Sequence, residues 1–320
     1  MLNEELKDKL ACPGCLGDLS FGEGDFTCNK CRRKYPVVDG IPVLINEDKS
    51  LFRIKDFLGR SSTTIELSGF NKGLLRKIWS RVTPELTLNI YSKRNFKKFI
   101  KEACDSAARP AILVIGGGVL GSGLAEITKN DKIVLIESDV SFGPRTQIIC
   151  DAHNLPFVDS SLDGVIAQAV LEHVTDPYKC VSEIYRVLRP KGLVYSEVPF
   201  MQQVHMGRYD FTRFTDLGHR RLFRNFEEIE RGVAGGPASA LAWSLRYFFV
   251  SFTDSRLIKK ILSAFSIFAF FWIKYFDFCL VKKASSADAA GGFYFLGRKS
   301  DKTVTDTEIV SLYKAKGKGS

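Results

Sequence analysis

From residue 111 onward, short apolar runs alternate with longer segments whose apolar positions recur at helical spacing. Residues 177–188 form such a helical segment, and it ends just before Arg189-Pro-Lys-Gly. Strands that alternate with helices in this way predict a parallel sheet covered on both faces. Residues 292–297 are apolar and predict a last, antiparallel strand. The runs that predict buried strands are 111–115, 132–136, 147–150, 164–167 and 193–197.

Changes in composition divide the 320 residues into six segments, and no internal repeat is visible. The first has two cysteine pairs, the second is basic, and the fourth is rich in Phe and Trp. The last is polar and predicted to be disordered. The segments are a small cysteine-bearing domain at 1–46, a helical connector at 47–110, the sheet core at 111–235, an aromatic helical insertion at 236–283, the final strand of the core at 284–299, and a tail at 300–320.

The connector holds much of the net charge of +10, with twelve lysines and arginines against three acids between Arg53 and Lys101. Residues 74–82 and 96–104 place apolar side chains at helical spacing, which predicts two amphipathic helices. Their basic faces are either simply solvated or form a surface for phosphate groups or anionic lipid.

Four of the eight cysteines form a C-x2-C-x12-C-x2-C array. Each C-x2-C turn directs two thiolates to a common centre, so the array predicts a closed tetrahedral Zn²⁺ site with a structural role. A domain this small would draw much of its folding free energy from the metal. The remaining cysteines are scattered, which favours a reducing compartment, and the polar start at residues 1–7 is not typical of a secretory signal. The predicted metal ligands are Cys12, Cys15, Cys28 and Cys31.

The residues around these cysteines carry a resemblance. Leu10-Ala-Cys-Pro-Gly-Cys and Tyr35-Pro-Val-Val-Asp-Gly-Ile-Pro-Val-Leu flank the array. Residues 7–46 resemble the small zinc-ribbon proteins that partner tRNA, ribosomal RNA and translation-factor methyltransferases. The resemblance implies a ribbon that stabilises or activates a methyltransferase, here within one chain.

A glycine-rich turn, Gly116-Gly-Gly-Val-Leu-Gly121, follows the first strand of the core. Glycine permits close approach of a ligand to the backbone and positive φ angles. The second strand leads to Glu137, about 20 residues after the turn, where a carboxylate can accept hydrogen bonds from ribose hydroxyls. The third leads to Asp151, where a carboxylate can accept a hydrogen bond from an adenine amino group. Asp139 is either a support for the ribose or a turn residue.

Together with Ser161-Leu-Asp-Gly-Val and Glu183-Ile-Tyr-Arg-Val-Leu-Arg-Pro-Lys-Gly, these pieces make residues 111–198 resemble class I SAM-dependent methyltransferases of the domain-11 type. The resemblance implies a seven-stranded, doubly wound, Rossmann-like sheet with S-adenosylmethionine (SAM) at the carboxyl ends of its strands. One position departs from the family: Val114 stands where an acid usually helps to hold the methionine end of SAM. The predicted cofactor-binding residues are Gly116, Gly117, Gly118, Gly121, Glu137, Asp151, Ala152 and Gln168.

The acceptor side is predicted after the fifth strand, where residues 199–219 are too polar and aromatic for a core segment. A hydroxyl acceptor needs a general base, and His205 and Asp210 are the candidates for that role. His173 is interpreted as a packed, hydrogen-bonded residue rather than a base. The residues predicted to bind the acceptor, including two arginines that can hold a carboxylate or phosphate, are Gln203, Arg208, Tyr209 and Arg213.

The insertion at 236–283 combines an uncharged apolar stretch, 261–273, with basic residues at its edges. Thirteen residues are short for a bilayer span. The segment is therefore either an element lying in a membrane interface or a buried cap over the acceptor pocket or a dimer surface.

Three hypotheses for function follow. The first is a SAM-dependent enzyme that methylates a small-molecule or lipid-linked glycan acceptor, with O-methylation favoured, in the cytoplasm or peripherally on the inner face of the membrane. The second is a zinc-ribbon methyltransferase of ribosomal or transfer RNA, although an Asn/Asp-Pro-Pro-Tyr motif does not follow the fourth strand. The third is a catalytically silent SAM-fold scaffold that binds a partner protein, a reading that Val114 favours.

Overall fold

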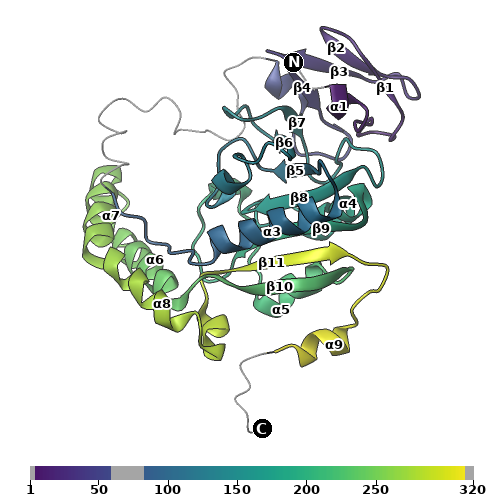
Figure 1. Cartoon of the computed structure of the whole chain (residues 1–320). Coiled ribbons are helices and arrows are strands. Elements are labelled where there is room, and N and C mark those ends of the chain that lie inside the picture. Colours follow the sequence, from purple (N-terminus) through teal and green to yellow (C-terminus); the bar gives the residue numbers. More distant parts are fainter. Residues whose placement is uncertain (1–3, 59–82, 314–320) are drawn as a thin grey trace.

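The computed structural model describes residues 4–58 and 83–313. Within this part of the chain the strands form one continuous mixed sheet in the order β1-β2-β3-β4-β7-β6-β5-β8-β9-β11-β10 (Figure 1). Their bounds are Leu19–Phe21 (β1), Asp25–Cys28 (β2), Lys34–Val38 (β3), Ile41–Leu44 (β4), Ala111–Ile115 (β5), Val134–Asp139 (β6), Ile148–Cys150 (β7), Leu162–Gln168 (β8), Leu188–Pro199 (β9), Phe226–Gly235 (β10) and Gly292–Lys299 (β11).

The sheet has more strands than the seven predicted. The seven strands from β7 to β10 are the predicted doubly wound core, with β7, β6, β5, β8 and β9 parallel. As predicted, β11 is antiparallel to its neighbours. The other four strands belong to the N-terminal domain, which was predicted as a separate unit. Its strand β4 pairs in parallel with β7, Val43 beside Ile149 and Leu44 beside Cys150, so this domain extends the core sheet.

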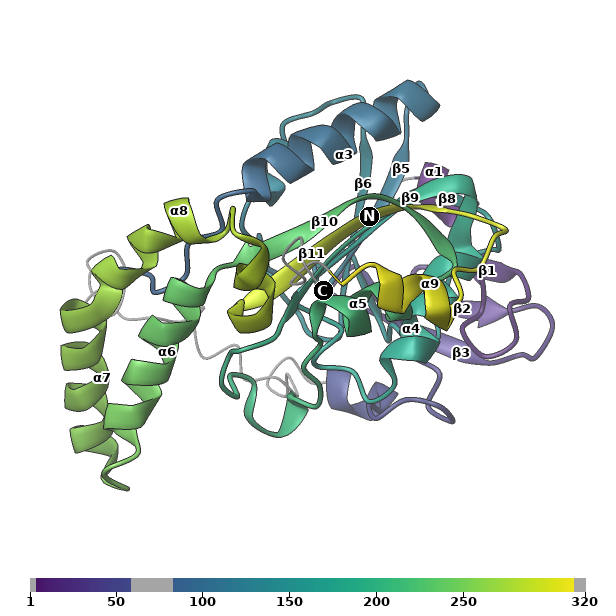
Figure 2. The ribbon, with the colours of Figure 1, turned by 90° about the horizontal axis from the view of Figure 1, so that it is seen from below.

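Helices cover both faces of the core, as Figure 2 shows. Helix α3 lies on one face, where Phe96 and Phe99 pack against Ile112, Ile166 and Tyr195. Helices α4 and α5 lie on the other face, where the larger apolar cluster is buried. Burial on both faces explains why β5 is apolar at every position. The helices here are Ser92–Ser106 (α3), Pro177–Val187 (α4) and Asp216–Leu222 (α5).

The insertion forms a helical protrusion beside the core sheet (Figure 2). Helices α6 and α7 pack side by side, and a short 3-10 helix and α8 lead back toward β11. Asp277 is buried and accepts hydrogen bonds from the backbone N–H groups of Ala238 and Ser239, which ties the end of the protrusion to its beginning. The bounds are Pro237–Val250 (α6), Arg256–Phe270 (α7), Phe271–Phe276 (η4) and Asp277–Leu280 (α8).

The segments that flank the core, the connector and the tail, are each described in part. Only the second helix of the connector lies in the described residues, as α3; the helix predicted at 74–82 lies outside them. The prediction of a disordered tail at 300–320 is wrong for its first part. Helix α9, Asp306–Ser311, begins with a capping box between Thr305 and Glu308, and Asp306 pairs with Arg221. The same Thr-x-x-Glu signal precedes an apolar pair in the sequence.

Candidate functional site

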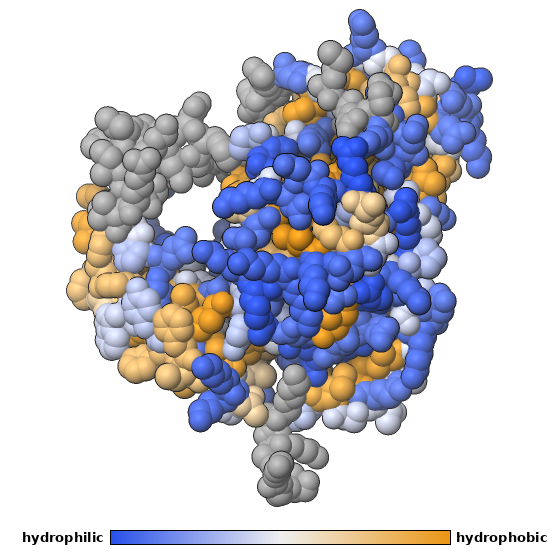
Figure 3. All heavy atoms as spheres, in the orientation of Figure 1, coloured by the Kyte–Doolittle hydropathy of each residue, from blue (hydrophilic) through white to orange (hydrophobic). Residues whose placement is uncertain are grey.

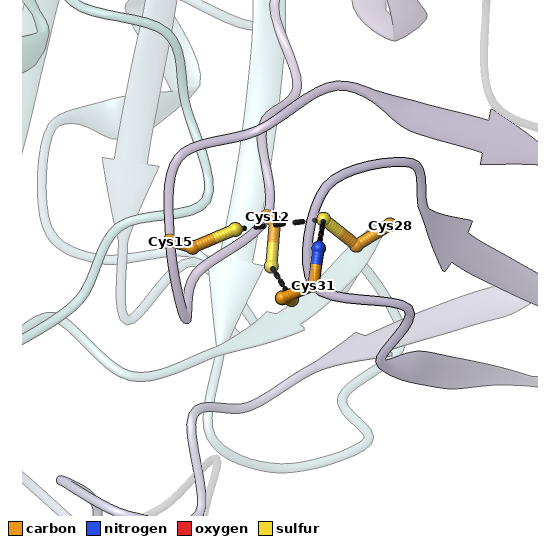
Figure 4. A group of neighbouring side chains, drawn as sticks. All are labelled: Cys12, Cys15, Cys28 and Cys31. Atoms are coloured by element: carbon orange, nitrogen blue, oxygen red, sulfur yellow. Dashed lines mark hydrogen bonds between the residues drawn. The ribbon is translucent and has the colours of Figure 1, made fainter.

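The four cysteines of the array meet at one point of the N-terminal domain (Figure 4). All four Sγ atoms lie within 4.8 Å of one another, with 3.7 Å between Cys12 and Cys31 and 3.5 Å between Cys15 and Cys28. Four thiolates around Zn²⁺ at about 2.3 Å stand about 3.8 Å apart in a tetrahedron, so this donor set fits the ion. The hydroxyl of Tyr35 lies 3.1 Å from Cys12 Sγ and orients it.

The glycine-rich turn follows β5 and crosses the carboxyl edge of the sheet. Gly116 has φ of +71°, and a Cβ atom there would meet Val170 at 2.6 Å, so the position requires glycine. Gly121 approaches the side chain of Gln168 so closely that it also has no room for a Cβ atom. The Gln168 amide donates to Ser122 O at 3.0 Å and to Glu197 at 2.9 Å. Gln168 therefore fastens the turn to the ends of two core strands.

Two acids of β6 lie against the turn, Glu137 beside Gly117 and Asp139 beside Gly118, but only Asp139 also lines the crevice. Asp139 Oδ2 accepts a hydrogen bond from Gly118 N at 3.0 Å, and Asp139 lines the crevice beyond the turn. Burial raises the pKa of the Asp139 carboxyl. Glu137 lies two residues deeper in β6, is absent from the residues that line the crevice, and pairs with Arg145 at 2.6 Å. The ribose contact predicted for Glu137 stays a prediction, and β6 continues three residues beyond the predicted strand end.

Asp151 and Ala152 line the same crevice from the end of β7. Burial alone would raise the pKa of Asp151, but hydrogen bonds from His153, at 2.6 Å, and from Ser50 lower it. Leu51 and Phe52 of the connector also line the crevice, whose cavity measures about 80 Å³. Pockets for drug-sized ligands measure roughly 300–1,000 Å³, so the crevice is narrow by comparison.

The donors and acceptors of the crevice suit an adenosyl group. Asp139 and Asp151 stand at the carboxyl ends of the adjacent strands β6 and β7, on one side of the point where the sheet order reverses between β5 and β8. Gln168 Oε1 is buried and has no hydrogen-bond partner in the described part of the chain. This oxygen packs against Gly121 of the turn, while Val114 is buried in the sheet.

A second cavity, of about 330 Å³, opens at the ends of β8, β9 and β10. Its polar lining includes Glu197, Glu172, His205 and Asn89, and Trp243 of α6 forms part of the wall. Burial raises the pKa of Glu197, which accepts hydrogen bonds from Tyr195, from Gln168 and from Asn89 at 3.1 Å. Helix α6 of the insertion thus supplies one wall of this cavity, and the choice between a cap and a membrane-interface element stays a prediction.

Glu172, His173 and His205 form a cluster between the two cavities. The two Nε2 atoms are 3.1 Å apart, and Glu172 Oε1 is 3.7 Å from His173 Nε2 and 3.9 Å from His205 Nε2. Burial raises the pKa of Glu172 to about 8 and lowers the pKa of His173. Glu172 and His205 line the larger cavity, whereas His173 lines the crevice.

The other residues predicted on the acceptor side are arranged differently. Arg213 and Asp210 form a bidentate ion pair that holds the pKa of Asp210 well below its usual range, so Asp210 is poorly suited to the predicted role of base. Arg213 also donates to Gln203 O at 3.1 Å, and with its guanidinium engaged it does not offer a free fork to an acceptor. The Gln203 amide donates to Ser244, and Tyr209 lines the crevice instead of the larger cavity. Arg208 stacks on Tyr209 at the surface.

Sequence comparisons identify two families in the chain. Residues 128–196 match the methyltransferase domain family, and residues 4–40 match the Trm112p-like protein family. The chain therefore contains a domain that matches the methyltransferase family and a Trm112p-like domain. The Trm112p-like domain is 42% identical over 50 residues to a UPF0434 protein of Magnetococcus marinus, which is 15% of this chain and 85% of that protein.

The methyltransferase domain has more distant relatives. An uncharacterized methyltransferase of a Mycobacterium species is 33% identical over 90 residues, which are 26% of this chain and 36% of that protein. A transposon protein of Streptomyces fradiae is 28% identical over 170 residues. The match spans 46% of the latter protein, less than half its length.

Two of the solved structures that are similar to this chain come from named organisms. One is a putative sarcosine dimethylglycine methyltransferase from Galdieria sulphuraria, at 14% identity and a TM-score of 0.43, with 71% of this chain and 97% of that chain covered. The other is the complex between the Haloferax volcanii Trm112 activator and a putative methyltransferase, at 18% identity and a TM-score of 0.38, with 68% and 99% covered.

Three residues of the site are not among those predicted from the sequence. Glu172, Glu197 and Asn89 all line the acceptor cavity, and the Glu172 side chain is buried. A glutamate at the end of an otherwise apolar strand is the one signal that singles out Glu197 from sequence.

Proposed function

We propose that the protein transfers a methyl group from SAM to a hydroxyl of a lipid-linked or small glycan acceptor. The observation that carries this proposal is the arrangement of the two cavities, which share the cluster of Glu172, His173 and His205. A cofactor crevice and an acceptor cavity that meet at titratable side chains are what methylation of a hydroxyl requires.

The residues of this chain divide the work as follows. SAM supplies an electrophilic methyl group when it is bound. Asp139 and Asp151 would accept hydrogen bonds from its adenosyl part, and Gln168 would hold the glycine-rich turn in place beside it. The cluster lies where the acceptor hydroxyl would bind and promotes loss of its proton, with His205 as the imidazole most open to the acceptor cavity.

A trough that leaves the acceptor cavity supports a lipid-linked acceptor. The cavity shares Thr87 and Trp243 with a neighbouring hollow of about 430 Å³. That hollow shares Arg246 and Ile267 with a groove of about 810 Å³ between α6 and α7. Arg246, Lys259 and Lys260 line the groove among apolar side chains. This order of surfaces matches the parts of a lipid-linked sugar. The sugar would lie beside Trp243, the phosphate beside these cations, and the apolar chain along the two helices.

The protrusion is proposed to rest on an anionic membrane at the inner face. Apolar side chains gather on it, and Figure 3 shows apolar atoms over the region of α6–α8. By length and composition alone, residues 256–280 are long and apolar enough to cross a membrane, and they are mostly exposed. Basic side chains flank this apolar surface, which fits an interfacial position. The large apolar side chains exposed there include Phe248, Phe252, Leu257, Ile261, Phe265, Trp272 and Phe276.

Zn²⁺ in the four-cysteine site is proposed to have a structural role. All four donors are thiolates of the protein, so a tetrahedral ion has no open position for a substrate. Because β4 joins the core sheet beside β7, a metal that stabilises the ribbon also stabilises the edge that carries Asp151.

The proposal is tested by tracing labelled methyl groups. The purified full-length chain is incubated with SAM labelled at the methyl group and with a bacterial extract, which is then separated into lipid, RNA and protein fractions. We expect label in a lipid-extractable glycan that is stable to mild base, as an ether is. Label confined to RNA would favour the alternative of an RNA methyltransferase. No SAM binding at all would favour the silent scaffold.

A further inference from the structure

The cluster between the two cavities has the composition of a metal site that the four-cysteine array does not account for. Glu172, His173 and His205 are brought together from the turn after β8 and from the loop after β9, 33 positions apart in the chain. The backbone N–H groups of Phe211 and Thr212 donate to Glu172 O, which holds the loop against the turn. The three donor atoms therefore have fixed places.

The hydrogen bonds of the two imidazoles determine which nitrogens are free. His173 Nδ1 lies 2.8 Å from Tyr209 O, and His205 Nδ1 lies 3.3 Å from Gln203 O. A carbonyl oxygen only accepts hydrogen bonds, so each Nδ1 carries a proton, and each neutral ring then presents a lone pair at Nε2.

These two lone pairs face one another across 3.1 Å, and neither is satisfied by the other. Glu172 adds a carboxylate that is 1% exposed and accepts no hydrogen bond from the described residues. Three unsatisfied acceptors pointing at one place are costly unless a cation joins them. The distances of 3.1, 3.7 and 3.9 Å between them are those of ligands about 2.0–2.2 Å from a shared ion.

We propose that Glu172, His173 and His205 bind a first-row divalent transition-metal ion, with Zn²⁺ and Co²⁺ as suitable probes. Two imidazoles and one carboxylate suit such ions better than Mg²⁺, which takes oxygen ligands. The surroundings match those of ligating histidines: backbone carbonyls orient both rings, and Asp210 Oδ2 stands 3.4 Å from His205 Nδ1. The ion pair with Arg213 keeps Asp210 in this position.

The place of the cluster gives the ion a task, and this part of the inference rests on the proposed function. Three protein ligands leave coordination positions open, and two of the ligands line the acceptor cavity. An acceptor hydroxyl bound there loses its proton to water more readily. The resulting alkoxide oxygen then forms the new bond to the methyl carbon while the methyl–sulfur bond of SAM breaks, and the sulfonium leaves as a neutral thioether.

The test is a calorimetric titration of the full-length chain. The protein is first loaded with one equivalent of Zn²⁺, which occupies the four-cysteine site, and Co²⁺ is then added. We expect a further equivalent to bind, with visible absorption bands but no additional thiolate charge-transfer absorption. Glu172→Gln and His205→Gln should each weaken this step by about 100-fold or more, while Glu23→Gln, which removes an exposed carboxylate outside both cavities, should leave it unchanged.

Three results would overturn the metal site: no further equivalent in the parent chain, a further equivalent that the variants retain, or one that shows thiolate absorption. A proton shared between the two imidazoles would give the first of these results. SAM affinity is measured on the same samples, so failure of the proposed function is seen separately. A chain that binds the second ion but not SAM would keep the metal site and lose the methyltransferase activity.

Discussion

The carboxylate of Asp139 accepts a hydrogen bond from the backbone N–H of Gly118 at 3.0 Å, and this contact fixes the acid at the mouth of the glycine-rich turn. Glu137, two residues earlier, is held by Arg145 instead. We therefore expect Asp139→Asn to weaken SAM binding by about 10- to 100-fold, the range for loss of a hydrogen bond to a charged group. Equilibrium dialysis with labelled SAM measures the change. Glu137→Gln is the matched control, and an equal or larger loss there would return the ribose role to Glu137.

The Trm112p-like domain and the methyltransferase domain should unfold together, because β4 and β7 pair within one sheet. Cys28→Ser removes a ligand of the predicted zinc site, and we expect it to lower both the zinc content and the melting temperature of the whole chain in a single transition. Cys279→Ser changes an exposed cysteine far from the ribbon and should alter neither. Two separate transitions in the variant would mean that the two domains are energetically independent.

Stability should fall in mild acid because of His219. This side chain is fully buried beside Ser196, and burial lowers its pKa to about 3, with Arg231 and Arg220 adding to the effect. The unfolded chain binds a proton at this residue below about pH 6.5, whereas the folded chain does not until about pH 3.

The free energy of unfolding therefore decreases as the pH falls from 6.5 toward 3, by up to about 1.4 kcal/mol per pH unit from this group alone. Urea unfolding at several pH values measures the slope. His219→Gln removes the titrating group and should flatten the slope relative to the parent chain. An unchanged slope would show that other groups dominate the acid sensitivity.

The cationic groove between α6 and α7 should contribute to membrane binding. Lys259→Glu combined with Lys260→Glu reverses two charges there, and each basic residue near an anionic surface contributes about 1 kcal/mol. We expect the double variant to bind vesicles rich in phosphatidylglycerol at least 10-fold more weakly in a sedimentation assay. Lys129→Glu with Lys132→Glu makes the same change in net charge on the loop before β6 and should have little effect. If both double variants bind vesicles equally weakly, the effect arises from net charge and not from the groove.

The trough beyond the acceptor cavity predicts a split between the two substrates. Trp243 forms part of the cavity wall, and Arg246 stacks on it with the guanidinium carbon 5.0 Å from the ring centroid. Trp243→Ala should raise KM for a lipid-linked acceptor about 10-fold or more, since stacking and burial of the indole are lost. The dissociation constant of SAM should not change. An equal rise in the dissociation constant of SAM would show that the effect of Trp243 is not specific to the acceptor.

Local signals in the sequence predicted the parts of this structure that local chemistry determines. Four cysteines at fixed spacing specify a common centre, and a glycine run after an apolar strand specifies a turn with positive φ at Gly116. The same signals placed the end of β6 too early, because Glu137, Ser138 and Asp139 are all polar enough to end a strand. Only pairing with β5 shows that the strand continues.

Contacts between distant segments were not predictable in this way. The pairing of β4 with β7 joins residues more than 100 positions apart, and no pattern in either strand names its partner. The cluster of Glu172 and His205 depends likewise on how the loop after β9 folds back. Arg213 had the composition of an anion-binding residue, yet its neighbour Asp210 takes up the charge three positions away.

The binding of SAM to the purified chain tests the central claim most directly. Isothermal titration calorimetry should show one equivalent bound with a dissociation constant well below 1 mM, which is a free energy more favourable than about −4 kcal/mol. It should also show competition by the demethylated product. Absence of heat up to 1 mM SAM, in protein whose folding is confirmed, would contradict the account and leave only the ribbon and its cysteines explained.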